Sequence, residues 1–216
     1  MTDRNKVVWS EGQYLRTQHL QQQDRHFGWL LRQALRASPL QSFGFTGLQL
    51  DGEAREAGQM ALTTAAGVMP DGTIFAIPEG SFPVAPAVPS AKTGAGLVRL
   101  AIPSETAGAA EIDAAHDEPS GMRYRGDSVT VRDAVRGGAD PTEIEVARLA
   151  PKLLLPGEET AGYTTLPIAR ITGLTADGAV ALDRGFLAPS LNIGAVAWYG
   201  QFLKELVAGI DRIAEE

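Results

Sequence analysis

The hydrophobic period changes twice along this chain of 216 residues, and those two changes limit the folds open to it. Apolar residues recur every three or four positions from about residue 17 to residue 37, every second position in runs between residues 43 and 183, and every three or four again after Pro189. The first and last patterns are typical of amphipathic helices, and the middle pattern is typical of half-buried strands. We therefore predict a mainly β fold with a helix near each end.

The first helix is predicted over about residues 17–37. Thr17 can cap its first turn, and Ser38-Pro39 ends it because a residue before proline avoids the helical region. Its apolar residues follow one another at intervals of seven or four residues: Leu20, Phe27, Leu31 and Leu35. Ahead of the helix, the residues Lys6–Trp9 predict a short strand.

The middle of the chain is predicted to form about nine short strands separated by turns. Pro70-Asp71-Gly72 and Asp177-Gly178 each stand between two alternating runs, which is the pattern of a hairpin. The 24 glycines and 13 prolines, with only 6% aromatic residues, favour strands and turns over a helical bundle. The pattern fits a β-sandwich or an irregular barrel, and we predict the sandwich, with residues 104–121 as a surface loop.

The last apolar pattern predicts a stem helix after Pro189. Its spacing of threes and fours is the a/d pattern of a bundle or coiled coil, and a helix of about two and a half heptads is marginal alone. We expect it to belong to a longer bundle or to an oligomer; packing onto its own sandwich is the alternative. The predicted seam consists of Val196, Leu203, Leu206, Ile210 and Ile213.

Charge and cysteine content exclude several classes of function. The net charge of −7 argues against a general nucleic-acid binder, although residues 1–37 carry +3 and the remainder −10. The absence of cysteine excludes disulfides, thiolate zinc sites and cysteine nucleophiles. No signal-peptide pattern and no apolar run of membrane-span length occurs, so we expect a cytoplasmic protein.

The histidines and carboxylates of the sequence do not form a recognisable catalytic or metal site. His19 and His26 are seven positions apart, which separates them by about 10 Å along a helix, too far for one metal ion. His116 stands in a polar loop, and Glu143 and Glu145 share one face of a predicted exposed strand without an implied cleft. We expect no catalytic residue, no metal and no cofactor.

The opening stretch WSEGQYLRTQHLQQQDRHF closely resembles the N-terminal signature of the TssK family, the baseplate subunits of the bacterial type VI secretion system. Thr17 stands where that family commonly has proline, and both residues suit a helix start. The stretches MPDGTIFAIP, EIEVARLAPKLLL and LDRGFLAPSL are similar to later segments of the family, so the resemblance spans nearly the whole chain. The matching positions in the opening stretch are Trp9, Glu11, Gly12, Leu15, Gln18, His19, Gln21, Gln22 and Asp24.

The resemblance implies a non-enzymatic building block. It implies that residues 1–190 form a β-sandwich shell domain, similar to the shoulder domain of phage receptor-binding proteins, and that residues 191–216 form the first helix of a truncated bundle. TssK-like proteins form trimers, contact the TssF and TssG wedge subunits through their N-terminal part, and reach the membrane complex through a C-terminal part beyond this chain. They assemble at the cytoplasmic face of the inner membrane.

Four residues of the opening stretch are expected at or just beneath the wedge-facing surface: Trp9, Tyr14, Leu15 and His19. Aromatic side chains and arginine are enriched where one protein holds another, but tryptophan is more often buried, so a core position for Trp9 is the alternative. An alternative function is a carbohydrate- or protein-binding β-sandwich module of a phage-tail-like particle. A carbohydrate-binding sandwich predicts exposed aromatic residues on strands or loops, whereas Trp29 and Trp198 lie in predicted helices.

Overall fold

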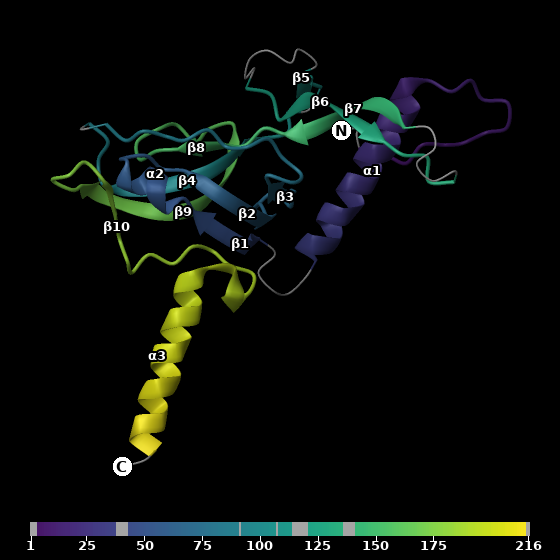
Figure 1. The fold of residues 1–216 in the computed structure, drawn as a ribbon. Helices are drawn as coiled ribbons and strands as arrows, with labels where there is room; N and C mark the ends of the chain where they lie inside the picture. The colour runs from purple at the N-terminus through teal and green to yellow at the C-terminus, as the bar shows by residue number, and fades with distance from the viewer. Residues whose placement is uncertain are drawn as a thin grey trace.

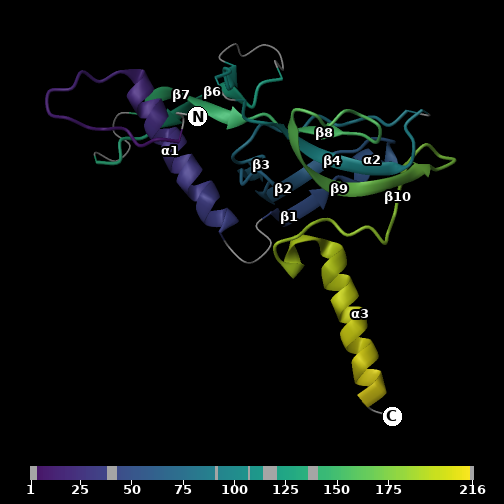
Figure 2. The same cartoon turned by 180° about the vertical axis from the view of Figure 1, so that it is seen from behind.

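The protein consists of a β-rich body with one long helix beside it and another projecting from it (Figures 1 and 2). Helix α1 (Thr17–Arg36) lies beside the body, and helix α3 (Ala197–Ala214) extends away from it towards the C-terminus. The predicted mainly β fold with a helix near each end is confirmed. The structure is a computed structural model that describes residues 4–37, 43–90, 92–106, 108–113, 121–135 and 141–214.

Three sheets make up the β-rich body. The first is antiparallel in the order β1-β2-β3 and comprises β1 (Gly44–Leu50), β2 (Leu62–Val68) and β3 (Ile74–Ile77). The second has the order β10-β9-β4-β8 and comprises β4 (Gly96–Pro103), β8 (Lys152–Leu154), β9 (Tyr163–Leu174) and β10 (Val180–Leu182). The third has the order β5-β6-β7 and comprises β5 (Ile112–Asp113), β6 (Tyr124–Val131) and β7 (Thr142–Leu149).

The main hydrophobic core combines side chains from the first two sheets. Val98, Leu100 and Ile102 alternate along β4 and are fully buried, as period-two patterning requires for the inner face of a strand. From the facing sheet, the rings of Phe45 and Phe75 meet edge to face with their centroids 5.9 Å apart. The sandwich-like packing of two sheets therefore follows directly from the alternation in the sequence.

Both predicted hairpin turns are confirmed. Asp71-Gly72 lies between β2 and β3, and Asp177-Gly178 lies between β9 and β10. The two glycines have φ values of +89° and +84°, in the left-handed region that disfavours other residues. Both turns therefore favour glycine because of their backbone conformation.

Several local predictions were wrong or incomplete. Lys6–Trp9 is not a strand, and the short helix α2 (Gly52–Glu56), whose first turn is capped by the Asp51 carboxylate, was not predicted. The expected surface loop 104–121 contains the two-residue strand β5, which pairs in parallel with β6. Residues 107 and 114–120 of that loop, including His116, lie outside the described residues.

Within the described part of the chain, no helix has both the length and the apolar character needed to cross a bilayer.

A substitution at Gly67 in β2 tests how closely β1 and β2 are paired in the first sheet. A Cβ atom added there would lie 2.2 Å from the carbonyl oxygen of Gly44 on the neighbouring strand, so the backbones must separate. Gly67→Ala is expected to lower the free energy of unfolding by about 3 kcal/mol, at the upper end of ordinary overpacking. Gly47→Ala in β1 is the matched control, since nothing lies within 4 Å of its Cβ position. Equal denaturant midpoints for the two variants would contradict this packing.

Candidate interaction surface

The residues before α1 fold back along the helix. The His26 ring donates from Nδ1 to the carbonyl oxygen of Arg4 at 2.9 Å, and the Gln22 side chain donates to the carbonyl oxygen of Asn5 at 2.7 Å. These hydrogen bonds place the first described residues beside the middle of α1. The chain then leaves the helix and returns to it at Thr17, so residues 6–16 form a projecting loop (Figures 1 and 2).

His19 fixes the other end of this loop to the start of α1. Its Nδ1 atom accepts a hydrogen bond from the backbone N–H of Arg16 at 3.0 Å, and the Gln13 side-chain amide lies 2.9 Å from its Nε2 atom. A side chain at this third helical position that reaches back to the N-cap backbone is half of a capping box, where glutamate or glutamine is usual. The Trp9 ring also lies against His19, with the ring centroids 6.0 Å apart. His19 is therefore half-buried and holds the loop in place.

The other three predicted contact residues lie on this loop with their side chains largely uncovered. Tyr14 is 81% exposed, Leu15 55% and Trp9 51%. The described structure thus places Trp9 beside His19, and Tyr14 and Leu15 just before the helix. Three large apolar or aromatic side chains on one projecting loop form a surface suited to contact with another protein.

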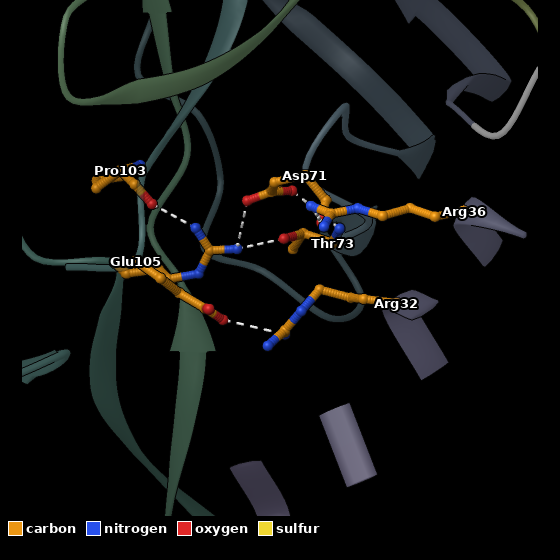
Figure 3. Close-up of polar contacts among 7 residues, drawn as sticks. Arg32, Arg36, Asp71, Thr73, Pro103 and Glu105 are labelled. Atoms are coloured by element: carbon orange, nitrogen blue, oxygen red, sulfur yellow. Dashed lines mark hydrogen bonds and ion pairs between the residues drawn. The ribbon is translucent and has the colours of Figure 1, made fainter. Parts of the chain in front are cut away.

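Helix α1 is held to the body by charged side chains on one of its faces (Figure 3). Arg32 forms an ion pair with Glu105, with 3.0 Å between Nη1 and Oε1, and Arg36 donates to the carbonyl oxygen of Asp71. The aliphatic part of the Arg32 side chain also lies over Gly72. A Cβ atom added to Gly72 would lie 3.0 Å from the Cγ atom of Arg32. The glycine of the β2–β3 turn is therefore required both by its φ angle and by the approach of α1.

Arg123 lies at the centre of the polar network behind this contact. Its side chain is only 3% exposed and donates to the carbonyl oxygen of Pro103, the Asp71 carboxylate and the Thr73 hydroxyl. Burial by itself lowers the pKa of Arg123, but the Asp71 carboxylate, with smaller effects of Tyr124 and Glu105, leaves that pKa raised above the usual arginine value. The guanidinium therefore stays charged and joins the β2–β3 turn, the end of β4 and the start of β6.

The apolar side of α1 faces away from the body. No residue of α1 is buried, and Leu20, Phe27 and Leu31 are each more than half exposed. An amphipathic helix at the surface of a globular protein ordinarily turns its apolar stripe to the core. Two apolar residues of α1, Trp29 and Leu35, are half-buried. The half-buried residues also include polar ones such as Gln22, His26 and Arg32.

The stem helix α3 also leaves apolar side chains uncovered. Leu206, Ile210 and Ile213 are exposed, and Leu203 is half-buried. Val196, however, does not belong to the helical seam. It precedes α3 in extended backbone (φ −130°, ψ 127°) and packs against the β-rich core, because the helix begins one residue later than the apolar spacing predicted. The Tyr199 hydroxyl donates to the carbonyl oxygen of Ala188 and ties the first turn of α3 to the body.

The described part of the chain holds no candidate metal centre. No group of three or more histidine, aspartate and glutamate side chains there could hold a metal ion. Glu143 and Glu145 lie on one exposed face of β7, as predicted, and Ser128 donates to the Glu143 carboxylate. Acid–base chemistry needs a cleft with groups aimed at a common point, and this exposed face does not supply one.

The network of Arg32, Arg36 and Arg123 was not predicted from the sequence. Arg32 and Arg36 are four residues apart, so the sequence indicates that they share one charged helix face. It does not indicate which residues that face contacts. Their contacts, Glu105 and Asp71, are far away in the sequence. Arg123 could have been noticed only as a single charge beside a predicted strand.

The comparisons with known proteins agree with this architecture. Residues 19–216 match the family described as "Bacterial Type VI secretion, VC_A0110, EvfL, ImpJ, VasE". The chain belongs to this family. The type VI secretion system baseplate component TssK1 of Pseudomonas aeruginosa is 33% identical over 207 residues, which cover 96% of this chain and 47% of that relative. The resemblance of the opening stretch to the TssK family is therefore confirmed.

Solved structures of the family share the fold. A crystal structure of TssK superposes with a TM-score of 0.89 at 28% identity, over 99% of this chain and 50% of the other. A chain of a TssK–TssF–TssG baseplate subcomplex of the type VI secretion system, determined by cryo-electron microscopy, superposes with a TM-score of 0.82 at 21% identity, over 96% of this chain and 69% of the other. The chain spans about half the length of TssK1 and of the TssK crystal structure.

Replacing Arg123 tests whether its network stabilises the fold. Arg123→Ala is expected to lower the free energy of unfolding by about 3 kcal/mol, because Asp71 and Thr73 lose their partner in a partly buried site. The matched control is Arg184→Ala, which removes an exposed arginine. Denaturant unfolding followed by circular dichroism measures both variants. A loss below about 0.5 kcal/mol for Arg123→Ala, the range of ordinary surface changes, would contradict the assignment.

Proposed function

We propose that this chain is a non-enzymatic structural module of a type VI secretion baseplate that binds the TssF and TssG wedge subunits. The observation that carries the proposal is the projecting loop 6–16, which is fixed to α1 at both ends and leaves Trp9, Tyr14 and Leu15 uncovered. The fold it shares with a chain of a TssK–TssF–TssG baseplate subcomplex supports the choice of partner.

Each proposed contact residue has a separate role. Tyr14 and Leu15 bury their apolar surface against the wedge, and Trp9 contributes the exposed half of its ring. His19 acts through the loop, since its ring braces the start of the helix. Because the loop is already held in place, binding loses less conformational entropy than binding through a free terminus would.

The chain is further proposed to join a homotrimer through α3. The half-buried Leu203 and the exposed Leu206, Ile210 and Ile213 follow one another at intervals of three or four residues, which suits a bundle seam. In this proposal residues 1–190 are the shell domain and residues 191–216 begin the bundle. The assembled particle lies at the cytoplasmic face of the inner membrane, and contact with the membrane complex belongs to a part of the protein beyond this chain.

Co-purification with a TssF–TssG complex of the same secretion system tests the proposed function. Tyr14→Ala and Trp9→Ala are expected to reduce the wedge recovered with residues 1–216 at least about tenfold, as expected for central aromatic contacts. Val88→Ala, which shortens an exposed apolar side chain elsewhere, should leave recovery unchanged. Circular dichroism and the melting temperature should stay the same in all three variants. Full recovery of the wedge by a folded Tyr14→Ala, Trp9→Ala double variant would refute the proposal.

A further inference from the structure

A row of polar side chains on α1 holds the residues that precede the helix. His19, Gln22 and His26 are three and four residues apart, so they lie along one helix face, and all three are half-buried. His19 braces loop 6–16 where the loop enters the helix. Gln22 and His26 hold the other end of the loop, and we call these two residues the α1 clamp.

The α1 clamp binds the main chain. The Gln22 side-chain amide donates to the carbonyl oxygen of Asn5 at 2.7 Å, and the His26 ring donates from Nδ1 to that of Arg4 at 2.9 Å. A carbonyl oxygen can only accept a hydrogen bond, so the Nδ1 atom of His26 carries a hydrogen. The clamp therefore fixes two successive backbone groups and does not depend on the side chains of Arg4 and Asn5.

The His26 ring is itself held in orientation. It stacks on the Trp29 ring, with the centroids 6.1 Å apart and the planes inclined by 24°. Trp29 is half-buried and lines a cavity of about 500 Å³ between α1 and the body, together with Arg32 and Tyr124. The donor of His26 is therefore aligned by a ring that belongs to the contact between α1 and the body.

The chain becomes buried directly after the residues that the α1 clamp binds. Val7 is only 8% exposed, whereas the next residue, Val8, is 77% exposed. Loop 6–16 is described throughout, and every residue in it other than Val7 is exposed. The position of the loop thus depends on its two ends.

The clamp also sets the direction of the loop. Arg4 lies beside His26, and Trp9 lies beside His19, so the chain runs antiparallel to α1, towards the start of the helix. The seven positions between the two histidines correspond to about 10 Å along the helix axis. Fixing the chain at Arg4 thus directs Trp9, and the exposed residues after it, to the first turn of α1.

We propose that Gln22 and His26 are positioning residues for wedge binding. They do not touch TssF or TssG, because Arg4 and Asn5 lie over their polar groups. They determine the affinity by holding loop 6–16 in the conformation that the wedge binds. The inference rests on the proposed function and identifies the residues that prepare the loop for it.

Loss of the clamp would lower the affinity by changing the unbound chain. A loop that is attached at one end only adopts many conformations, and ordering it again costs conformational entropy. The apparent dissociation constant rises in inverse proportion to the fraction of chains whose loop is already in the binding conformation. Two exposed hydrogen bonds contribute modestly, so we expect this fraction to fall to about one tenth when both are removed.

Isosteric substitutions can remove the donors of the clamp and keep its size. His26→Leu together with Gln22→Met, the clamp double variant, is expected to raise the dissociation constant for the TssF–TssG complex about tenfold. His26→Asn should stay within about twofold of the unchanged chain, since the Nδ2 atom of asparagine lies where histidine has Nδ1 and donates likewise. Gln21→Met, the same change at the exposed neighbouring position, is the matched control.

The rate constants distinguish positioning from direct contact. In biolayer interferometry the clamp double variant should associate more slowly and dissociate at an unchanged rate, because its bound loop makes the same contacts with the wedge. Loss of a direct contact acts mainly on dissociation, as we expect for Tyr14→Ala. Faster dissociation of the clamp double variant, with unchanged association, would show that Gln22 or His26 touches the wedge and would overturn the inference.

Trypsin can measure the clamp in the free chain. Cleavage after Lys6, detected by mass spectrometry, should be several-fold faster in the clamp double variant than in Gln21→Met, since proteolysis follows the population of the opened segment. Circular dichroism and the melting temperature should be the same in both variants. If His26→Leu lowers the melting temperature, Gln22→Met alone supplies the same measurements, with an expected loss of affinity of about threefold.

The outcomes separate this inference from the proposed function. An unchanged dissociation constant for the folded clamp double variant would overturn the inference, while weaker binding by Tyr14→Ala would still support the proposed function. Equal dissociation constants for His26→Asn and His26→Leu would exclude the hydrogen bond to Arg4 as the cause and would also overturn it. If Tyr14→Ala bound the wedge as tightly as the unchanged chain, the proposed function would fail, and this inference with it.

Discussion

The arrangement of this protein depends on one buried guanidinium. Arg123 binds Asp71, Thr73 and Pro103, and so joins a turn of the first sheet to strands of the other two. The same turn receives α1, since Arg36 donates to the carbonyl oxygen of Asp71 (Figure 3). The aliphatic part of the Arg32 side chain also lies over Gly72. The position of the helix relative to the sandwich is therefore set by charge and hydrogen bonds, while the sandwich itself is held by apolar packing.

This division of forces explains why α1 can be amphipathic and yet keep its apolar side free. If packing had attached α1 to the core, Phe27 and Leu31 would be buried and unable to contact a partner. Attachment through Arg32 and Arg36 leaves both side chains uncovered. In our account, the loop 6–16 is the surface through which the N-terminal part of the chain joins an assembly.

The sequence predicted the elements better than the contacts between them. The bounds of α1 and the two hairpin turns follow from local signals: apolar spacing, Ser38-Pro39, and glycine at positions of positive φ. The face of α1 that meets the body could not be predicted, because Glu105 and Asp71 are distant from α1 in the sequence. The sequence around a charged loop residue does not indicate which residue it will pair with. The spacing rule placed Val196 in the stem helix, although its contacts with the core keep it in extended backbone.

Hydrogen exchange of residues 1–216, alone and bound to the TssF–TssG wedge, tests the central claim that loop 6–16 is the part recognised. We expect amide exchange to slow on binding in residues 7–16 and at the start of α1, and to stay unchanged in the β9–β10 hairpin. Unchanged exchange in residues 7–16, together with protection that arises only in β9 and β10, would contradict it.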